Sequence, residues 1–282
     1  MWLEGEVDPG EVGARATALA RLRAGGVPVP RAFVLGRALF IEFTSRARRD
    51  DARHVPVKLP AELSREIAVA LRGLGGSFAI RRSPLEGAPP DDAWLSSSQG
   101  GRPERETYLH LTDASEVSEA IRRIWGQGLI TSPPPVPVAI VVQRFMAPEV
   151  CAVVRRDRTD SDVLHVSSTL GVGDLLAAGL VVPDRHTIRC DGHVLASALG
   201  RKAQMSVPRP DGGVVRVPVP AHAARRAAID DAKLAELACT WRTAAAAVES
   251  LMSLGCSWSG GRWHATSAVS TRPAEQTNLM LG

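Results

Sequence analysis

The sequence predicts an α+β protein built from two sheet-containing lobes. In the first half of the chain, segments with apolar residues at helical spacing alternate with short apolar runs, which indicates helices alternating with strands. From about residue 150 onward, short runs rich in Val, Ile and Thr follow one another with turn residues between them, as in a largely antiparallel sheet. A chain of 282 residues, 45% of them hydrophobic, can bury the core that such a domain needs.

Three helices are expected in the first half, over residues 11–24, over 60–74 and after Asp113. A pair of glycines ends each of the first two helices, and Asp113 and Glu116 have capping-box spacing ahead of the third. The expected buried stripes are Val12, Ala16, Leu19 and Leu22, then Leu63, Ile67, Leu71 and Leu74, and then Val117, Ile121, Ile124 and Trp125. Strands are expected within 27–35, 77–80 and 138–143.

The second half is predicted to form strands at 151–156, 163–168, 185–190, 214–219 and 262–271. One long helix, from about residue 230 to 254, interrupts them. Its predicted buried stripe consists of Leu234, Leu237, Trp241, Val248 and Leu251. Trp258 and Trp263 flank a Ser-Gly-Gly turn, which is typical of a hairpin with aromatic packing across it.

Composition excludes several classes of protein. The net charge is +4, but the arginines are scattered among acidic residues and aromatic residues make up only 4%, so no nucleic-acid partner is expected. No apolar run approaches the roughly 20 residues that span a bilayer, and the N-terminus is acidic, so we expect a cytoplasmic protein without a membrane partner. The four cysteines are far apart and form no CxxC pair, which favours reduced core thiols over a zinc site or disulfides.

Several short motifs follow one another in a characteristic order. They are VGARATAL at 12–19, VPVPRAF at 27–33, IRRS at 80–83, RETYLHL at 105–111, VQRFM at 142–146, CAV at 151–153, GVGD at 171–174 with Pro183 and Asp184 downstream, GCSW at 255–258 and STRP at 270–273. In this order the chain resembles, over nearly its whole length, the ATP-binding domain of phosphoenolpyruvate synthase, pyruvate phosphate dikinase and rifampin phosphotransferase. No single motif is decisive, and their common order carries the resemblance.

The resemblance implies an ATP-grasp fold in which ATP lies in a cleft between the two lobes. It divides the chain into an N-terminal lobe over 1–138 and a C-terminal lobe over 139–282. It further implies three sets of site residues. The backbone from Gln143 through Arg144 and Phe145 to Met146 would hold the adenine edge, the turn with Gly171, Gly173 and Asp174 would line the nucleotide site, and Arg81 and Arg272 would bind phosphate, although surface ion pairs are the alternative for both arginines.

The chain departs from the family where the chemistry takes place. Arg15 replaces a lysine and keeps its positive charge. Ser257 and Ser270 replace a glutamate and a glutamine that are expected to hold Mg²⁺, a cation that usually needs at least one protein carboxylate. ATP is therefore an expected ligand, and magnesium is not expected to be held well.

The segment 87–101 replaces the family's phosphate-covering loop. Ser96 and Ser97 have hydroxyls that could help to cradle an anion, and a polar surface loop is an equally good interpretation. Glu86, Asp91 or Asp92 are candidates for a substitute carboxylate.

Three functional hypotheses follow. The first is a divergent ATP-grasp module with impaired or lost Mg-ATP catalysis. The second is an active ATP-dependent phosphotransferase (kinase-type) subunit that requires a separate partner protein with a phosphohistidine or acceptor domain. The third is a scaffold or protein-interaction module that binds no nucleotide.

Overall fold

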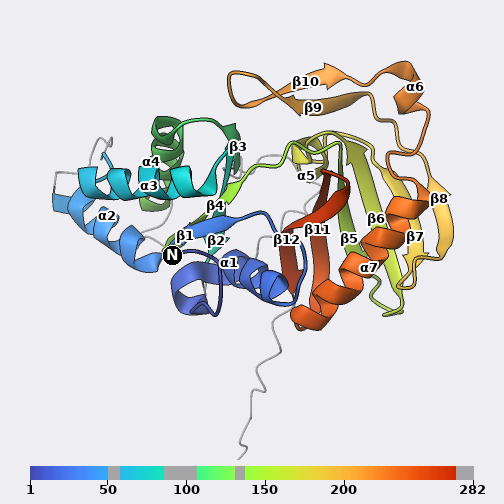
Figure 1. The fold of residues 1–282 in the computed structure, drawn as a ribbon, viewed down its shortest axis with the longest axis horizontal. Helices are drawn as coiled ribbons and strands as arrows, with labels where there is room; N and C mark the ends of the chain where they lie inside the picture. The colour runs from blue at the N-terminus through green and yellow to red at the C-terminus, as the bar shows by residue number, and fades with distance from the viewer. Residues whose placement is uncertain (50–57, 86–106, 131–136, 271–282) are drawn as a thin grey trace, which may run out of the picture.

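The computed structural model describes residues 1–49, 58–85, 107–130 and 137–270, and it shows two main sheets side by side with helices around them (Figure 1). Three predictions from the sequence are confirmed. The fold is α+β, the first half alternates helices with strands, and the second half is dominated by an antiparallel sheet. No helix in these ranges is long and apolar enough to cross a bilayer.

The N-terminal part is built on a four-stranded antiparallel sheet with the order β1-β4-β2-β3. The strands are β1 (Ala32–Leu35), β2 (Phe78–Pro84), β3 (Thr107–Leu111) and β4 (Val138–Arg144). Helices α2 (Arg37–Arg49), α3 (Ala61–Leu74) and α4 (Ala114–Ile130) supply the apolar partners of this sheet. Trp125 is fully buried among Phe40 and Phe43, and its indole donates to the Val138 carbonyl at 3.0 Å.

The C-terminal part is a six-stranded antiparallel sheet with the order β12-β11-β5-β6-β7-β8. The strands are β5 (Val150–Arg156), β6 (Val163–Leu170), β7 (Asp184–Arg189), β8 (Val194–Ala198), β11 (Leu251–Ser259) and β12 (Arg262–Ser270). Helices α1 (Pro9–Ala24) and α7 (Asp231–Ala247) share one apolar core with this sheet. The same core includes Ala139 and Val141 of β4, so apolar packing is continuous from one sheet to the other.

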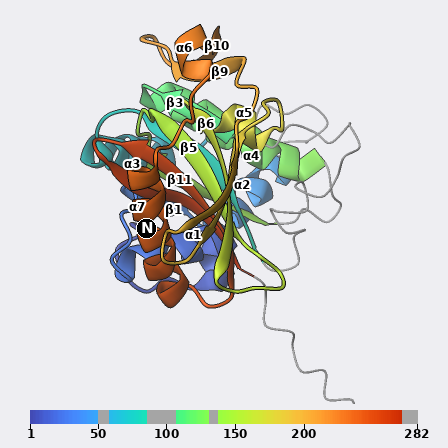
Figure 2. The same ribbon diagram turned by 90° about the vertical axis from the view of Figure 1, so that its right-hand side faces the viewer.

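A separate two-stranded sheet, formed by β9 (Gln204–Pro208) and β10 (Val214–Pro218), projects from the body beside two short helices, α5 (Asp174–Ala177) and α6 (Ala221–Ala224) (Figures 1 and 2). The predicted strand at 214–219 is therefore real, but it belongs to this hairpin and not to the large sheet.

The expected buried stripes of α1, α3 and α4 are all buried, which confirms those helices, whereas α2 was not expected from the sequence. The long helix was predicted to run too far: α7 ends at Ala247, where Val248 becomes extended, and Leu251 begins β11 opposite Ser270. Val248 and Leu251 are both buried, as residues of a helical stripe would be. Their apolar character therefore did not distinguish a continued helix from the start of a strand. The hairpin at Trp258 and Trp263 is confirmed, with the two rings 5.3 Å apart.

Two further expectations need correction. The division at 138/139 does not separate the sheets, because β4 runs to Arg144 and lies between β1 and β2. Of the four thiols, all of them free, Cys151 and Cys256 are buried, whereas Cys190 is only partly covered and Cys239 is exposed on α7.

Helix α1 is kinked at Gly13, where the chain passes very close to β2. Gly13 has φ 78° and ψ 170°, a region that is essentially restricted to glycine. A Cβ atom there would lie 2.6 Å from the carbonyl oxygens of Ser83 and Pro84. The close approach allows the Ala16 N–H to donate to Ser83 Oγ at 3.0 Å, which ties α1 to β2.

One ion pair is fully buried at the root of the β9–β10 hairpin. The Lys202 ammonium donates to Asp184, and neither side chain has any exposed surface. Asp184 also accepts the N–H groups of Gly200 at 2.8 Å and of Ala228 at 2.7 Å. Both oxygens of this carboxylate are thus engaged, which compensates for its burial.

We predict that Gly13→Ala destabilises the fold strongly, by more than about 3 kcal/mol, because it adds a steric clash to backbone strain. Gly26→Ala is the matched control, since Gly26 also has positive φ (83°) but a Cβ there meets nothing within 4 Å. It should cost only about 1–2 kcal/mol. Urea unfolding of both variants measures the difference, and equal losses would contradict the close-contact explanation.

We also predict that Lys202→Met lowers the free energy of unfolding by about 3–5 kcal/mol, because Asp184 would stay buried without its cation. The exposed pair of Arg189 with Asp162 provides the comparison, and Arg189→Met should cost less than about 1 kcal/mol. Thermal and urea denaturation of the two variants would decide the point. A Lys202 variant as stable as the Arg189 variant would show that the buried pair contributes little.

Candidate functional site

Arg81 of β2 joins the two sheets at their junction. Its Nη1 donates to Gln143 Oε1 on β4 at 3.0 Å and to the backbone carbonyl of Thr266 on β12 at 3.1 Å. Gln143 is itself buried, with its amide nitrogen 3.5 Å from the Pro30 carbonyl. Two of the residues that were predicted to contact nucleotide therefore contact each other, at a point where both sheets meet.

The charge of Arg81 is held in a site with little solvent. Burial and, to a smaller extent, the positive charge of Arg15 lower the pKa of its guanidinium to about 10, while Cys151 acts in the opposite direction. The group still carries its charge at neutral pH. Two like charges near one buried position are the arrangement that an anionic ligand would relieve.

Arg15 reaches this junction from α1, directly after the kink at Gly13. Its Nε donates to the Arg82 carbonyl at 2.9 Å. Because Gly13 permits the close approach of α1 to β2, the kink sets where Arg15 lies relative to Arg81. The proximity of the two arginines is thus a result of the close backbone approach at Gly13.

A row of four side chains crosses the six-stranded sheet beside Arg81. The strand register places His264, Ser257, Cys151 and Thr169 next to one another on β12, β11, β5 and β6, and all four are buried. They lie on the face opposite to the apolar core, since their sequence neighbours Ala265, Cys256 and Ala152 are the ones that belong to it. The described residues leave His264 Nδ1 and Thr169 Oγ1 without a hydrogen-bond partner.

This row, which we call the neutral row, carries no negative charge at neutral pH. Burial raises the pKa of the Cys151 thiol to about 11, although a hydrogen bond with Ser257 Oγ, 3.2 Å from its Sγ, and the charge of Arg81 act against that rise. Burial, together with the charge of Arg262, lowers the pKa of His264. A neutral thiol, a hydroxyl pair and an uncharged imidazole therefore occupy the sheet at this point.

The glycine turn at 171–174 packs directly over Cys151. A Cβ on Gly173 would lie 3.1 Å from the Cys151 Cβ, and one on Gly171, whose φ is 71°, would lie 2.3 Å from the Ser206 carbonyl oxygen. Asp174 follows the turn, accepts the Ser206 hydroxyl on Oδ2 at 2.8 Å, and keeps Oδ1 buried without a partner in the described part of the chain. The charge of Asp174 contributes to the raised pKa of Cys151.

The segment from Gln143 to Met146 leads from β4 toward β5. The N–H of Arg144 donates to the Arg31 carbonyl at 2.8 Å and that of Phe145 to the Ser77 carbonyl at 2.7 Å, so neighbouring backbone already uses these donors. The Phe145 ring lies 5.1 Å from the His110 ring. Of the predicted adenine-edge donors after Gln143, the Met146 N–H is the one that makes no hydrogen bond among the described residues.

Ser257 and Ser270 do not lie together. Ser257 is opposite His264 near the turn of the β11–β12 hairpin, whereas Ser270 is opposite Leu251 at the other end. Ser257 and Leu251, the β11 partner of Ser270, are six residues apart on the strand. At about 3.4 Å per residue, this corresponds to roughly 20 Å. One metal ion could not contact both positions in this structure. Arg272, Ser96, Ser97, Glu86, Asp91 and Asp92 lie outside the described residues.

Sequence reasoning missed several neighbours of the site. Cys151 was interpreted only as a core thiol, and Thr266, Ser206 and His110 were not singled out. Thr266 enters through its backbone carbonyl, which carries no side-chain signal. Cys151 alternates with core residues on β5, a period-2 signal that places it on the opposite face, but only the register shows that Ser257 is its neighbour.

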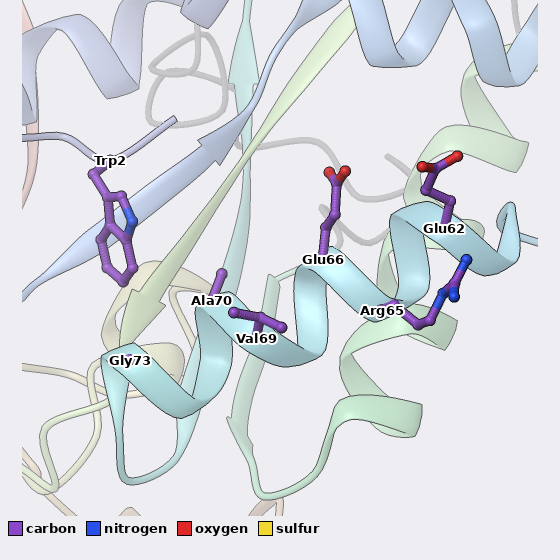
Figure 3. Close-up of a pocket in the computed structure, with 7 residues that line it drawn as sticks. All are labelled: Trp2, Glu62, Arg65, Glu66, Val69, Ala70 and Gly73. Carbon is purple, nitrogen blue, oxygen red and sulfur yellow. The ribbon is translucent and has the colours of Figure 1, made fainter.

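A separate groove of about 650 Å³ lies on the exposed side of α3 and under Trp2 (Figure 3). It is lined by Trp2, Glu62, Arg65, Glu66, Val69, Ala70 and Gly73. None of these residues was predicted to bind nucleotide, and the groove contains none of the side chains around Arg81.

The chain is similar in sequence to several known proteins. No family model matches the chain. A prodigiosin-synthesizing transferase, PigC, of Serratia marcescens is 25% identical over 239 residues, covering 76% of this chain and 26% of the relative. A probable phosphoenolpyruvate synthase of Methanothermobacter thermautotrophicus is 23% identical over 276 residues, covering 83% and 40%. A rifampicin phosphotransferase of a Streptomyces species is 26% identical over 197 residues, covering 64% and 22%.

Similar solved structures are more distant in sequence. An acetyl-coenzyme A synthetase of Ca. Korarchaeum cryptofilum matches with a TM-score of 0.47 and 13% identity, over 92% of each chain. The protein PH1788 of Pyrococcus horikoshii matches with a TM-score of 0.48 and 9% identity, also over 92% of each.

The chain spans between 22% and 40% of the length of the three curated relatives above. The matches to these proteins agree with the resemblance that the ordered motifs indicated. The chain is similar to phosphoenolpyruvate synthases and rifampicin phosphotransferases, and its architecture of two sheets with helices around them is α+β.

Proposed function

We propose that this chain binds ATP at the junction of its two sheets and does not by itself carry out magnesium-dependent phosphoryl transfer. The observation that carries the proposal is the charge distribution there. Two arginines, Arg81 and Arg15, meet a row of buried side chains without negative charge. This arrangement suits the phosphates of a nucleotide and does not suit the metal that usually accompanies them.

The fit to phosphate rests on the donors that remain on Arg81. Both of its hydrogen bonds to the described residues use Nη1, and a guanidinium has further N–H groups on Nε and Nη2. Because Nη1 is fixed from both sheets, the plane of the guanidinium is set before a ligand arrives. Preorganised donors of this kind lose little side-chain entropy on binding an anion.

The fit to magnesium fails at position 257. Mg²⁺ is bound through one or two carboxylates together with phosphate oxygens and water. Ser257 offers a hydroxyl already shared with a thiol that stays protonated at neutral pH, and Arg81 adds a repulsive positive charge nearby. Asp174 has a free oxygen, yet it lies beyond Cys151 and is held by Ser206. We therefore derive no catalytic step through a metal.

The longer relatives put the proposal in context. A phosphoenolpyruvate synthase that is more than twice as long as its matched part has room for further domains, and a separate partner could supply them to this chain. Transfer to a histidine on such a partner usually requires Mg²⁺ on the phosphates, and the neutral row offers no carboxylate to hold that ion. A nucleotide-binding module with a regulatory or structural task agrees better with these residues.

We predict that the purified chain binds ATP weakly, with an affinity that changes less than about threefold when Mg²⁺ is replaced by EDTA. Isothermal titration calorimetry, supported by thermal shifts, would measure this. Tight binding that depends on Mg²⁺ would contradict the loss of metal function and favour an active phosphotransferase subunit. No heat and no thermal shift with any nucleotide would instead contradict ATP binding and leave a scaffold.

Restoring a carboxylate provides a second test. Ser257→Asp should make ATP binding depend on Mg²⁺, with affinity at least fivefold higher with the metal than with EDTA, because a charge next to the phosphate site would then offset the cation. Ser270→Asp is the matched control: it adds the same charge to the same hairpin at its far end, and it should leave the metal response unchanged. Equal responses of both variants would show that position 257 does not face the nucleotide.

A further inference from the structure

The β9–β10 hairpin leaves the six-stranded sheet and extends toward β3 of the other sheet (Figure 1). The view turned by 90° also shows it on the side of the molecule where β3 lies (Figure 2). Among the described residues, the hairpin forms a ladder only with itself, and isolated bridges of Ser206 with Gly171 and Val172 connect it to the body. Its position depends on a small number of contacts at its root, its middle and its tip.

The root is fixed firmly. Asp184 accepts the N–H of Gly200 just before the hairpin and the N–H of Ala228 after it, and it pairs with the buried Lys202. One buried carboxylate therefore holds both ends of the excursion from residue 200 to 228. Any movement of the hairpin would start beyond this anchor.

The middle of the hairpin rests on the glycine turn of the candidate site. The Val172 N–H donates to the Ser206 carbonyl at 2.9 Å, and the Ser206 hydroxyl donates to Asp174 Oδ2 at 2.8 Å. The glycine turn itself covers Cys151, since Gly173 packs against that side chain. Lifting the hairpin would free the turn that closes over the neutral row.

The tip docks on His110 of β3. His110 Nε2 donates to the Arg209 carbonyl at 2.8 Å, because a carbonyl can only accept, and the Gly213 N–H donates to the His110 carbonyl at 2.8 Å. Nδ1 lies 2.8 Å from Ser77 Oγ, which accordingly donates to it in the neutral ring. His110 thus connects the hairpin tip to β2 and β3 and places its ring against Phe145.

The backbone at His110 is unusual in two ways. It has φ 58°, one of two positive values at non-glycine residues in the described chain. The ladder between β2 and β3 also shifts register here, because Tyr108 and Leu111 pair with Ile80 and Phe78, so that β3 has one extra residue. Bulges of this kind redirect a side chain and are common beside functional sites. Here the bulge directs the imidazole to the hairpin tip.

We propose that the β9–β10 hairpin is a strap that closes the site between the sheets, and that His110 is the latch residue that fastens its tip. Opening occurs locally: the tip releases from His110, the Ser206 contact with the glycine turn loosens, and Cys151 becomes accessible. The anchor at Asp184 and Lys202 stays in place. The strap stands on these contacts alone and does not require that the ligand of the site be ATP.

The two buried thiols allow a direct test. Cys151 lies under the strap-supported turn, whereas Cys256 faces the apolar core shared with α1 and α7. Modification by a maleimide at a fixed pH, followed for each cysteine by peptide mass spectrometry, reports local opening through Cys151 and global unfolding through Cys256. The exposed Cys239 reacts quickly in every variant and reports reagent activity.

The variant is His110→Asn, because asparagine tolerates positive φ and removes the imidazole contacts. We expect the rate of Cys151 modification to rise at least fivefold with the Cys256 rate unchanged. Ser206→Ala, which removes the contact with Asp174 and leaves His110 intact, should raise it as well.

His165→Asn is the matched control. His165 also has both ring nitrogens engaged, by Asp157 and Thr187, but lies on β6 away from the strap contacts. It should leave both rates unchanged. The strap is refuted if neither His110→Asn nor Ser206→Ala changes the Cys151 rate, or if Cys256 accelerates in parallel with Cys151.

Discussion

The guanidinium of Arg81 is the interaction on which the junction of the two sheets depends. One nitrogen serves a side chain of the first sheet and a backbone carbonyl of the second, at 3.0 and 3.1 Å. Because the contact is a hydrogen bond from a buried cation, it is directional as well as strong, and it fixes the spacing between β2, β4 and β12.

Other parts of the molecule serve this junction in different ways. The apolar core that α1 shares with both sheets brings them together without specifying how they are oriented. Gly13 adds specificity, since only a residue without Cβ lets α1 approach β2 closely enough to deliver Arg15. The strap acts across the opposite side of the junction, through His110 and the glycine turn. Packing, close backbone approach and a few polar contacts therefore act on the same interface.

The neutral row gives the junction of the two sheets no carboxylate ligand on β11. In a buried environment, each charge must be matched, and the protein supplies cations from α1 and β2 without carboxylates from β11. A thiol and a hydroxyl that share a hydrogen bond satisfy each other without offering a ligand to a hard cation.

The sequence alone determined the fold class, helices α1, α3 and α4, and most of the large sheet, because apolar periodicity is a local property of the chain, and its motif order indicated the resemblance to phosphoenolpyruvate synthases. It placed Arg81, Gln143 and Arg15 among the candidate residues for the same reason. Only the tertiary structure decided that Arg81 bonds to Gln143, that Ser257 neighbours Cys151, that Ser257 and Ser270 lie far apart, and that Leu251 starts a strand. These facts depend on strand register and on contacts between residues distant in sequence, and neither leaves a periodic signal along the chain.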